Sequence, residues 1–255
     1  MHAPVDLADV AADVLARIRA RAPRVHCITN TVAQNYTANV LLAAGAVPSM
    51  TVAPEEIVSF VASADALLVN IGTFDAERRS AIEVALGAVD AARMPWVLDP
   101  VFIESSPGRA QFARGLLARA PSAVRLNQTE FAPLFGGDPA GEAAARVAKA
   151  FTTVVALTGG VDIVTDGARH AAIANGHPLM GLVSAMGCAA SALLCAALAV
   201  ETDAWLAAVA AIAAFDVAGE VAAQTARGPG SFAAAITDAL YSLDGATLRA
   251  RVRVS

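Results

Sequence analysis

The feature that most constrains the fold is a regular alternation of short, β-branched apolar runs with longer stretches of helical spacing. Six such runs occur, at residues 24–30, 66–73, 95–101, 122–127, 152–160 and 161–167. Runs that are apolar on both faces are typical of parallel strands covered by helices on both sides. The alternation therefore predicts an α/β fold with a mostly parallel central sheet and helices on both faces. No linker or repeat interrupts residues 1–255, so we expect one domain.

Polar or small residues stand where these runs end. They are Asn30, Asn70, Asp99, Asn127 and Thr158. The last four follow one another at intervals of about 30 residues, which suits one strand plus one crossover helix. Because the carboxyl ends of parallel strands share one edge, and ligands bind at that edge, these side chains are expected to converge on a single site.

Two carboxylates near this edge have two interpretations. Asp99 precedes Pro100 at a strand end, and Asn127 and Glu130 stand three apart at a helix start. Asp99 fits a turn-former, and the Asn127–Glu130 pair fits a capping box. Asp99 and Glu130 together would also supply the hard oxygen ligands that Mg²⁺ prefers beside substrate phosphates. The residues alone leave both interpretations open.

A cysteine follows a glycine where the long apolar stretch near the C-terminus opens. If a helix begins near Gly187, its free N–H groups form an anion site. Cys188 would then lie beside a bound phosphate, with its pKa lowered by the helix dipole, as a weak base or an orienting group for a hydroxyl. The alternative is that Cys188 is a small buried hydrophobic residue, as we expect for Cys195.

Residues 156–167 predict a hairpin of two apolar strands around a glycine turn, with Thr158 and Gly159 at the edge that would face a nucleotide. Neither a G-x-G-x-x-G motif after a strand nor a G-x-x-x-x-G-K-[ST] motif occurs. A Rossmann dinucleotide site and a Walker-type NTPase are therefore disfavoured. A kinase that uses a metal ion and an anion hole remains.

Charge and composition exclude several classes of protein. The net charge is −5 and Lys149 is the single lysine, so nucleic-acid binding is not expected. Glu201 and Asp203 divide the apolar run at 188–215 into halves of about a dozen residues, too short for a membrane span. The N-terminal stretch carries early acids and no apolar core, unlike a secretion signal. The three cysteines form no CxxC pair, which predicts reduced thiols in a cytoplasmic protein.

Over nearly its whole length the sequence resembles the hydroxyethylthiazole kinase family of the ribokinase-like superfamily. The stretches that carry the resemblance are "VHCITNTVAQNYTANVLLAAGAVPSM", "ADALLVNIGTF", "VLDPV", "RLNQTEF", "LTGGVDIVTDG", "NGHPLM", "MGC" and "GPGSF". The resemblance implies a ribokinase-like fold and a transfer of phosphate from Mg·ATP to the hydroxyl of 4-methyl-5-(2-hydroxyethyl)thiazole, a step of thiamine salvage. It further implies a homotrimer that binds the thiazole at subunit interfaces.

The resemblance also implies roles for individual residues. Cys188 matches a cysteine that stands where most ribokinase-like enzymes carry a catalytic aspartate, whereas His26, Cys27 and His177 are expected to be structural. The expected substrate-binding residues are Asn30, Met50 and Ala185; the nucleotide-binding residues are Arg125, Asn127, Thr158 and Gly187; the metal-binding residues are Asp99 and Glu130.

The sequence departs from the family pattern toward the phosphate end. Phe102, Ile103 and Glu104 replace the usual glycines after Asp-Pro-Val, Leu126 replaces a glycine, Gly160 replaces a frequent glutamate, and Ala185 and Met186 replace Gly-Thr. These substitutions motivate two alternatives: a thiazole- or thiamine-precursor-binding protein with a degenerate ATP site, or a kinase for a related heterocyclic alcohol. A hydrolase with Cys188 as nucleophile and His177 as base is disfavoured, because no third residue orients the base.

Overall fold

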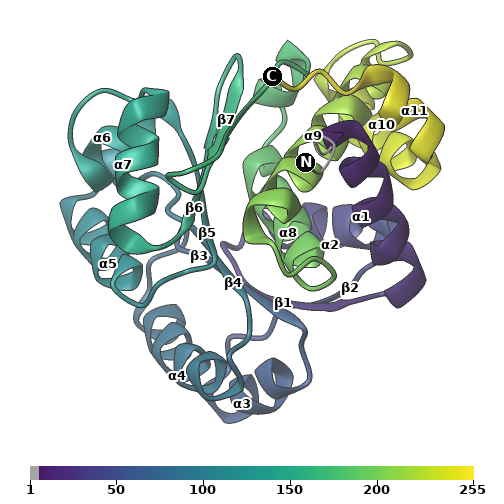
Figure 1. The fold of residues 1–255 in the computed structure, drawn as a ribbon. Coiled ribbons are helices and arrows are strands. Elements are labelled where there is room, and N and C mark those ends of the chain that lie inside the picture. Colours follow the sequence, from purple (N-terminus) through teal and green to yellow (C-terminus); the bar gives the residue numbers. More distant parts are fainter. Residues whose placement is uncertain (1–5) are drawn as a thin grey trace.

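In the computed structural model, which describes residues 6–255, one eight-stranded sheet has the order β2-β1-β3-β4-β5-β6-β7-β8 (Figure 1). Neighbouring strands from β2 to β6 are parallel, whereas β7 and β8 are antiparallel additions at one edge. The strands are β1 (Arg24–Ile28), β2 (Val47–Ser49), β3 (Ala66–Asn70), β4 (Trp96–Asp99), β5 (Ala123–Asn127), β6 (Val154–Thr158), β7 (Asp162–Thr165) and β8 (His170–Ile173). The predicted α/β fold with a mostly parallel sheet is confirmed, as is the β6–β7 hairpin.

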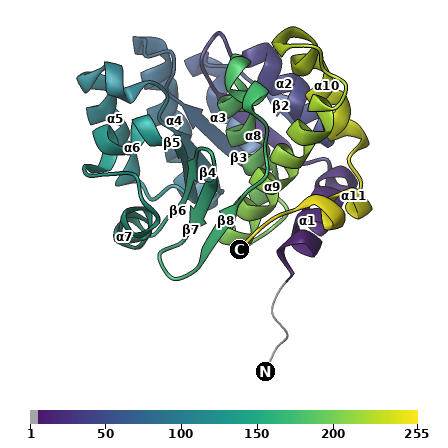
Figure 2. The same ribbon diagram turned by 90° about the horizontal axis from the view of Figure 1, so that it is seen from above.

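Two of these strands were not predicted, and both lie at sheet edges. β2 contains a proline and only three residues, and β8 has four, so neither leaves a clear apolar run in the sequence. Val254, near the C-terminus, forms a bridge to Ile173 of β8 and thereby covers part of that edge (Figure 2). Residues 1–5, which belong to the stretch interpreted as unlike a secretion signal, lie outside the described residues.

Helices cover both faces of the sheet, as Figures 1 and 2 show. On one face lie α1 (Leu7–Arg21), α2 (Gln34–Ala44), α8 (Met186–Leu198), α9 (Ala204–Ala223), α10 (Pro229–Ser242) and α11 (Gly245–Arg251), and on the other lie α3 (Pro54–Ala62), α4 (Ala76–Ala92), α5 (Pro107–Leu117), α6 (Gln128–Phe135) and α7 (Gly141–Phe151). Strand side chains alternate between the two cores: Cys27 belongs to the α8 side and Ile28 to the α4 side. Two short 3-10 helices, η1 (Ile103–Ser105) and η2 (Pro178–Leu182), lie in loops.

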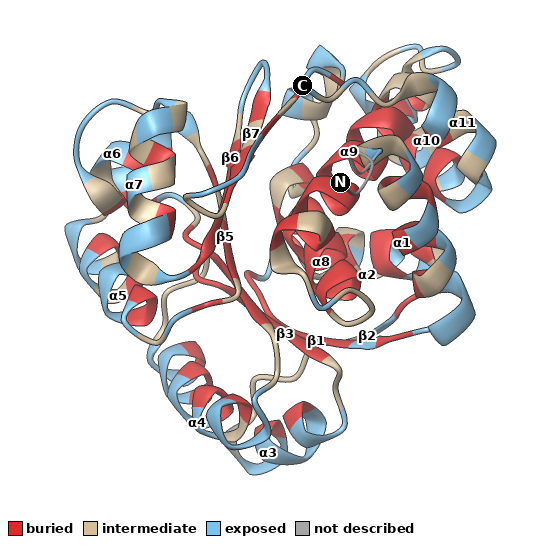
Figure 3. Cartoon of the chain, in the orientation of Figure 1, coloured by how far each residue is buried: buried red, intermediate tan, exposed pale blue. Residues whose placement is uncertain are grey.

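Helices α8 and α9 form the centre of the larger core (Figure 3). The sequence interpretation of α9 as an apolar segment of about a dozen residues was wrong, because the helix continues through Asp216 and Glu220 to reach 20 residues. Its length and composition match those of a membrane span, but 78% of its apolar window is buried inside the protein. The alanine side chains allow α9 to pack closely against its neighbours, so its apolar character is explained by burial in the core.

Candidate functional site

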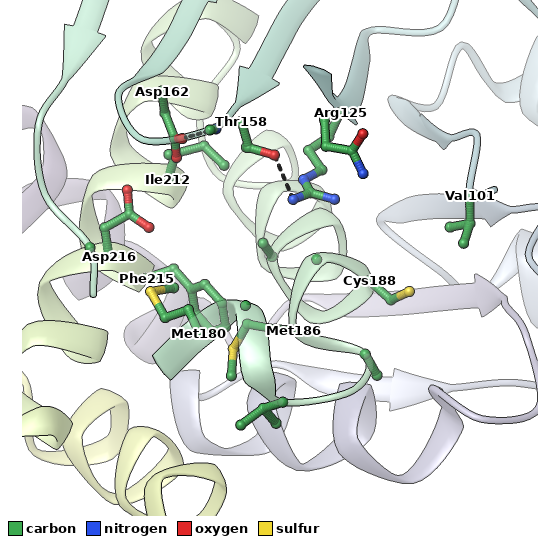
Figure 4. Close-up of a pocket in the computed structure, with 18 of the residues that line it drawn as sticks. Val101, Arg125, Thr158, Asp162, Met180, Met186, Cys188, Ile212, Phe215 and Asp216 are labelled. Atoms are coloured by element: carbon green, nitrogen blue, oxygen red, sulfur yellow. Dashed lines mark hydrogen bonds between the residues drawn. The ribbon is translucent and has the colours of Figure 1, made fainter. Parts of the chain in front are cut away.

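The register of the sheet brings the predicted polar strand ends together. Asn70 pairs with Asp99, and Asn127 pairs with Thr158, at the carboxyl edge of neighbouring parallel strands. A cavity of about 840 Å³ opens at this edge (Figure 4). The predicted site residues that line it are Asn30, Arg125, Asn127, Glu130, Thr158, Ala185, Gly187 and Cys188. The expected convergence on one edge is confirmed.

Two predicted residues do not line this cavity. Asp99 is fully buried beneath it. Met50 follows β2 and packs, half-buried, against the core on the α8 side. The residues on either side of Met50 are hydrogen-bonded to the fully buried ring of His26. Its Nδ1 lies 2.8 Å from Ser49 Oγ, and its Nε2 lies 3.0 Å from the Thr51 carbonyl oxygen. Within one chain, Met50 is therefore separate from the other candidate residues.

Helix α8 begins at the cavity, close to where the sequence places its start. No side chain of residues 6–255 caps the helix, and the preceding Ala185 has a left-handed φ of 67°. The backbone N–H groups of the first turn and the positive end of the helix dipole therefore form an anion site. The Arg125 guanidinium lies so close over Gly187 that a Cβ there would collide with it. Because residue 187 is a glycine, the Arg125 guanidinium and the N-terminus of α8 can both contact an anion bound at this anion site.

The Cys188 thiol lies in the first turn of α8 and is 8% exposed. Its Sγ accepts a hydrogen bond of 3.4 Å from Asn30 Nδ2, which also donates to Asn70 Oδ1 at 3.0 Å. Burial, followed by the negative charge of Asp99, raises the pKa of Cys188 to about 12. The expectation that the helix dipole lowers this pKa was wrong, because desolvation and the nearby carboxylate outweigh the dipole.

Asp99 is held below the cavity by one strong hydrogen bond. Asn70 Nδ2 donates to Asp99 Oδ2 at 2.6 Å, while Oδ1 is buried without a hydrogen-bond partner among residues 6–255. Burial raises the pKa of Asp99, and the opposing influence comes first from the positive charge of Arg125. The Cys188 and Ser191 side chains also lie against this carboxyl. Asp99 is therefore an acidic group with one free oxygen next to the thiol.

Glu130 and Asn127 form the capping box that was one of the two interpretations of this pair. Asn127 Oδ1 accepts from the Glu130 N–H at 3.0 Å, and Glu130 Oε2 accepts from the Asn127 N–H at 2.9 Å. Glu130 Oε1 accepts in addition from the Phe102 N–H at 3.2 Å. Burial, and then the charge of Asp99, raise the pKa of Glu130 to about 7. Glu130 thus caps α6 and also brings a carboxyl to the cavity wall.

Arg125 and Thr158 project from neighbouring strands and are joined by a hydrogen bond. Arg125 Nη2 donates to Thr158 Oγ1 at 2.6 Å, drawn as a dashed line in Figure 4. Leu126, one of the departures from the family pattern, is fully buried in the core on the α4 side. That substitution therefore leaves the Arg125–Thr158 pair in the cavity.

Two of the other departures occupy conformations that favour glycine. Phe102 has φ 55° and Ala185 has φ 67°, both in the left-handed region. The Phe102 side chain is 61% exposed at the cavity wall, whereas the next residue, Ile103, is buried. Glycine, which the family pattern has at positions 102 and 185, adopts this left-handed backbone conformation readily. In this chain Phe102 and Ala185 adopt the same conformation although both carry a side chain.

The structure adds a role and several residues that the sequence analysis did not assign to the site. Asn70, expected at the shared edge but given no role there, links Asn30 to Asp99. Asp162 and Asp216 line the far side of the cavity, and an acid inside the apolar pattern of α9 was a signal for Asp216. His177, expected to be structural, caps η2 through its Nδ1 and also lines the cavity.

Comparisons with known proteins agree with this geometry. The sequence model of the hydroxyethylthiazole kinase family matches residues 15–246. The chain is 45% identical over 256 residues to a hydroxyethylthiazole kinase of Rhizobium etli, covering 95% of this chain and 99% of that one. It is 43% identical over 244 residues to a probable hydroxyethylthiazole kinase of Agrobacterium fabrum, covering 96% of this chain and 94% of that one.

Solved structures give the same result. The hydroxyethylthiazole kinase protein of Pyrococcus horikoshii superposes with a TM-score of 0.92 at 37% identity, covering 96% of this chain and 98% of that one. Pyridoxal kinase from Staphylococcus aureus superposes with a TM-score of 0.63 at 16% identity, covering 78% of this chain and 88% of that one. This second likeness concerns the fold alone.

Proposed function

Because the chain belongs to the hydroxyethylthiazole kinase family, we propose that it transfers phosphate from Mg·ATP to the hydroxyl of 4-methyl-5-(2-hydroxyethyl)thiazole. It is a kinase, and its α/β fold is that of the ribokinase-like and pyridoxal kinases. We propose that residues 1–255 form a single domain with this fold. The observation that supports this reaction best is the meeting of the α8 N-terminus, Arg125 and Cys188 at one cavity. Phosphoryl transfer depends chiefly on positioning and on charge stabilisation, and these groups supply both.

In this proposal the polyphosphate lies between the start of α8 and Arg125. The first-turn N–H groups of α8, including those of Gly187 and Cys188, donate to phosphate oxygens, and the guanidinium neutralises their charge. Thr158 holds the guanidinium in place by the 2.6 Å hydrogen bond. The Asn127 amide is at the cavity wall, but its oxygen is already used to cap α6.

Asp99 and Glu130 fit a magnesium ion by their chemistry. The buried Oδ1 of Asp99 has no hydrogen-bond partner in the described part of the chain, and Asp99 lies close enough for its charge to add to burial in raising the pKa of Glu130. Over residues 6–255 no three Cys, His, Asp or Glu side chains group around a metal position, so phosphate oxygens and water would complete the shell. When bound, the ion would neutralise charge on the phosphates. Asp99 and Glu130 would hold it.

Cys188 acts in this reaction as a thiol that orients the attacking hydroxyl. A pKa of about 12 leaves almost no thiolate near neutral pH, so Cys188 is not a strong general base. The amide of Asn30 fixes the position of the sulfur at 3.4 Å. Asp99, directly against the thiol, stabilises its protonated form by its negative charge. The roles of Asn30 and Ala185 are to shape the pocket for the alcohol.

The substrate pocket is proposed to be completed by a second copy in a homotrimer. Met50 does not reach the cavity of its own chain. It follows β2, and exposed apolar side chains stand on this strand and on the helices before and after it in the chain: Leu42 on α2, Val47 on β2 and Val58 on α3. An exposed apolar surface at an unpaired sheet edge is typical of a subunit interface. Met50 would then contact the thiazole bound by a neighbouring chain.

The partner of the protein is thus a small thiazole alcohol, and the proposed process is thiamine biosynthesis or salvage in the cytoplasm. Neither nucleic acid nor a membrane is a proposed partner. The burial of α9 inside the protein favours a core helix over a membrane span. The single lysine, Lys149, leaves little positive charge for nucleic acid to bind. The unusual side chains Phe102 and Met186 line the cavity, so the preferred alcohol is part of the test.

The test is ADP release measured by a coupled assay over a panel of heterocyclic alcohols, with the thiazole alcohol included and Mg²⁺ titrated. We expect the thiazole alcohol to be the best substrate, and Asp99→Asn and Glu130→Gln to raise the Mg²⁺ concentration needed for half-maximal rate. Light scattering in the same buffer reports the trimer. Absence of alcohol-dependent ADP release across the panel, from a protein that is folded by circular dichroism, would refute the proposed reaction. An unchanged Mg²⁺ titration in both variants would remove the two acids from the metal site.

A further inference from the structure

A second cavity, of about 340 Å³, lies away from the site of the proposed transfer and is lined by residues of α5, α6 and α7. These three helices lie together on the side of the sheet opposite α8 (Figures 1 and 2). Within residues 6–255, the second cavity shares no lining residue with the cavity at the strand ends. Its volume is in the ordinary range of binding pockets for small molecules. The second cavity is therefore a candidate ligand site that the phosphate transfer does not use.

Three phenylalanine rings line the second cavity. Phe131 and Phe135 stand one turn apart on α6 and meet edge to face, with 5.2 Å between their ring centroids. The ring of Phe151, the last residue of α7, has its centroid 6.3 Å from that of Phe135. Phe131 is fully buried, whereas Phe135 and Phe151 are half-buried, so two of the rings remain partly accessible. Because aromatic rings pack favourably against one another, this lining favours a ligand that carries a ring.

Two arginines line the same cavity, and none of its described lining residues is acidic. Arg114 comes from α5 and Arg146 from α7, and both residues are exposed. Arg114 Nη1 donates to the Pro133 carbonyl oxygen at 2.6 Å, which satisfies one of the free carbonyls at the end of α6 and holds the guanidinium beside that helix. No ion pair of residues 6–255 includes either arginine. Both positive charges are thus available to a ligand.

We infer that the second cavity binds a small aromatic anion, that is, a ring system with one acidic group. The ring packs against Phe135 and Phe151, and the acidic group pairs with Arg114 and Arg146. Guanidinium groups form charge-assisted hydrogen bonds with carboxylate, sulfonate and phosphate oxygens, so the charge of the cavity selects an anion. A cation would face two like charges. The inference goes beyond the proposed function and does not depend on it, since the two cavities have separate linings.

The probe for this site is anilinonaphthalene sulfonate, an aromatic anion that fluoresces when bound, and phenylnaphthylamine, which lacks the sulfonate, is its neutral counterpart. The Kd and the number of sites per chain are measured for both dyes by fluorescence titration. Arg146→Gln removes one positive charge from the cavity. Lys149→Gln, exposed on the same helix and outside the cavity lining, is the control with an equal change of net charge. Ala150→Phe fills the cavity from an exposed position on α7, and Ala91→Phe, exposed on α4, is its control.

We expect Arg146→Gln to weaken sulfonate binding about two- to fivefold, the effect of one exposed ion pair, and to change the Kd of the neutral dye by less than about twofold. Arg114→Gln combined with Arg146→Gln should weaken sulfonate binding about tenfold. Ala150→Phe should remove one site per chain for both dyes, because the added ring occupies the space of the ligand. The two control variants should bind both dyes as the unmodified protein does.

An equal number of sulfonate sites in Ala150→Phe and Ala91→Phe would overturn the inference, because the dye would then bind elsewhere on the protein. Equal sulfonate affinity in Arg146→Gln and Lys149→Gln would overturn it as well, since the arginines of the cavity would not hold the acidic group. If circular dichroism shows that Ala150→Phe does not fold, the comparison of the arginine variants with Lys149→Gln still decides the matter, because these substitutions lie on the exposed surface.

Discussion

The strongest quantitative consequence of the site concerns the ionisation of Cys188. Burial and the charge of Asp99 raise its pKa from an ordinary value of 9.0 to about 12. With a pKa of about 12 in place of 9.0, the thiolate fraction at pH 8 is lower by about a thousandfold, and about one thiol in ten thousand is ionised. Only the thiolate reacts with alkylating agents, and the reaction rate therefore reports this fraction directly.

The perturbation is a stepwise increase of pH from 7 to 10.5 in the presence of iodoacetamide, with the modified cysteine identified by mass spectrometry. We expect the rate at Cys188 to rise about tenfold per pH unit over the whole range, with no plateau. Cys188→Ser reports background from Cys27 and Cys195, both fully buried. A plateau with a midpoint below pH 9 would show that the helix dipole dominates, and the assignment of Cys188 as an orienting thiol would be wrong.

Three further predictions follow from the same contacts. Cys188→Ala should lower turnover about ten- to hundredfold. Cys188→Asp should keep much of the turnover, because a carboxylate can also orient a hydroxyl. Equal turnover of Cys188→Ala and the unmodified enzyme would exclude Cys188 as the group that orients the attacking hydroxyl. The folded pKa of Glu130, about 7, exceeds its ordinary 4.5, so without metal the free energy of unfolding should fall as pH rises through this window. The fall is about 3 kcal/mol, and urea titrations of Glu130→Gln should lack it, whereas parallel pH curves would contradict it. The free energy of unfolding of Phe102→Gly should exceed that of Phe102→Ala by about 1 kcal/mol. Both variants lose the exposed ring, but only glycine adopts the positive φ of residue 102 without strain. Equal melting temperatures of the two variants would argue against strain at this position.

The alternation of apolar runs with helical stretches was enough to predict the sheet, its helical layers and the edge that holds the site. This is possible because side-chain periodicity and the handedness of strand–helix–strand units leave few arrangements for such a pattern. The same logic predicted that the strand ends Asn30, Asn127 and Thr158 share one edge, and all three line the cavity, whereas Arg125 was expected there from the family resemblance. Short edge strands such as β2 carry too little pattern to be recognised.

Other properties arise only when distant groups meet. The direction of the Cys188 pKa depends on how deeply the thiol is buried and on Asp99, which belongs to a strand on a separate part of the chain. The capping box of Asn127 and Glu130 was one of two interpretations of these residues, and the folded structure shows that it forms while the Glu130 carboxyl also lines the cavity. The meeting of Asp162 and Asp216 at one cavity has no local signature, since β7 and α9 come together only through packing. Local patterns thus determined the elements and their order, whereas desolvation and charge, which depend on through-space distances, were decided by the tertiary structure.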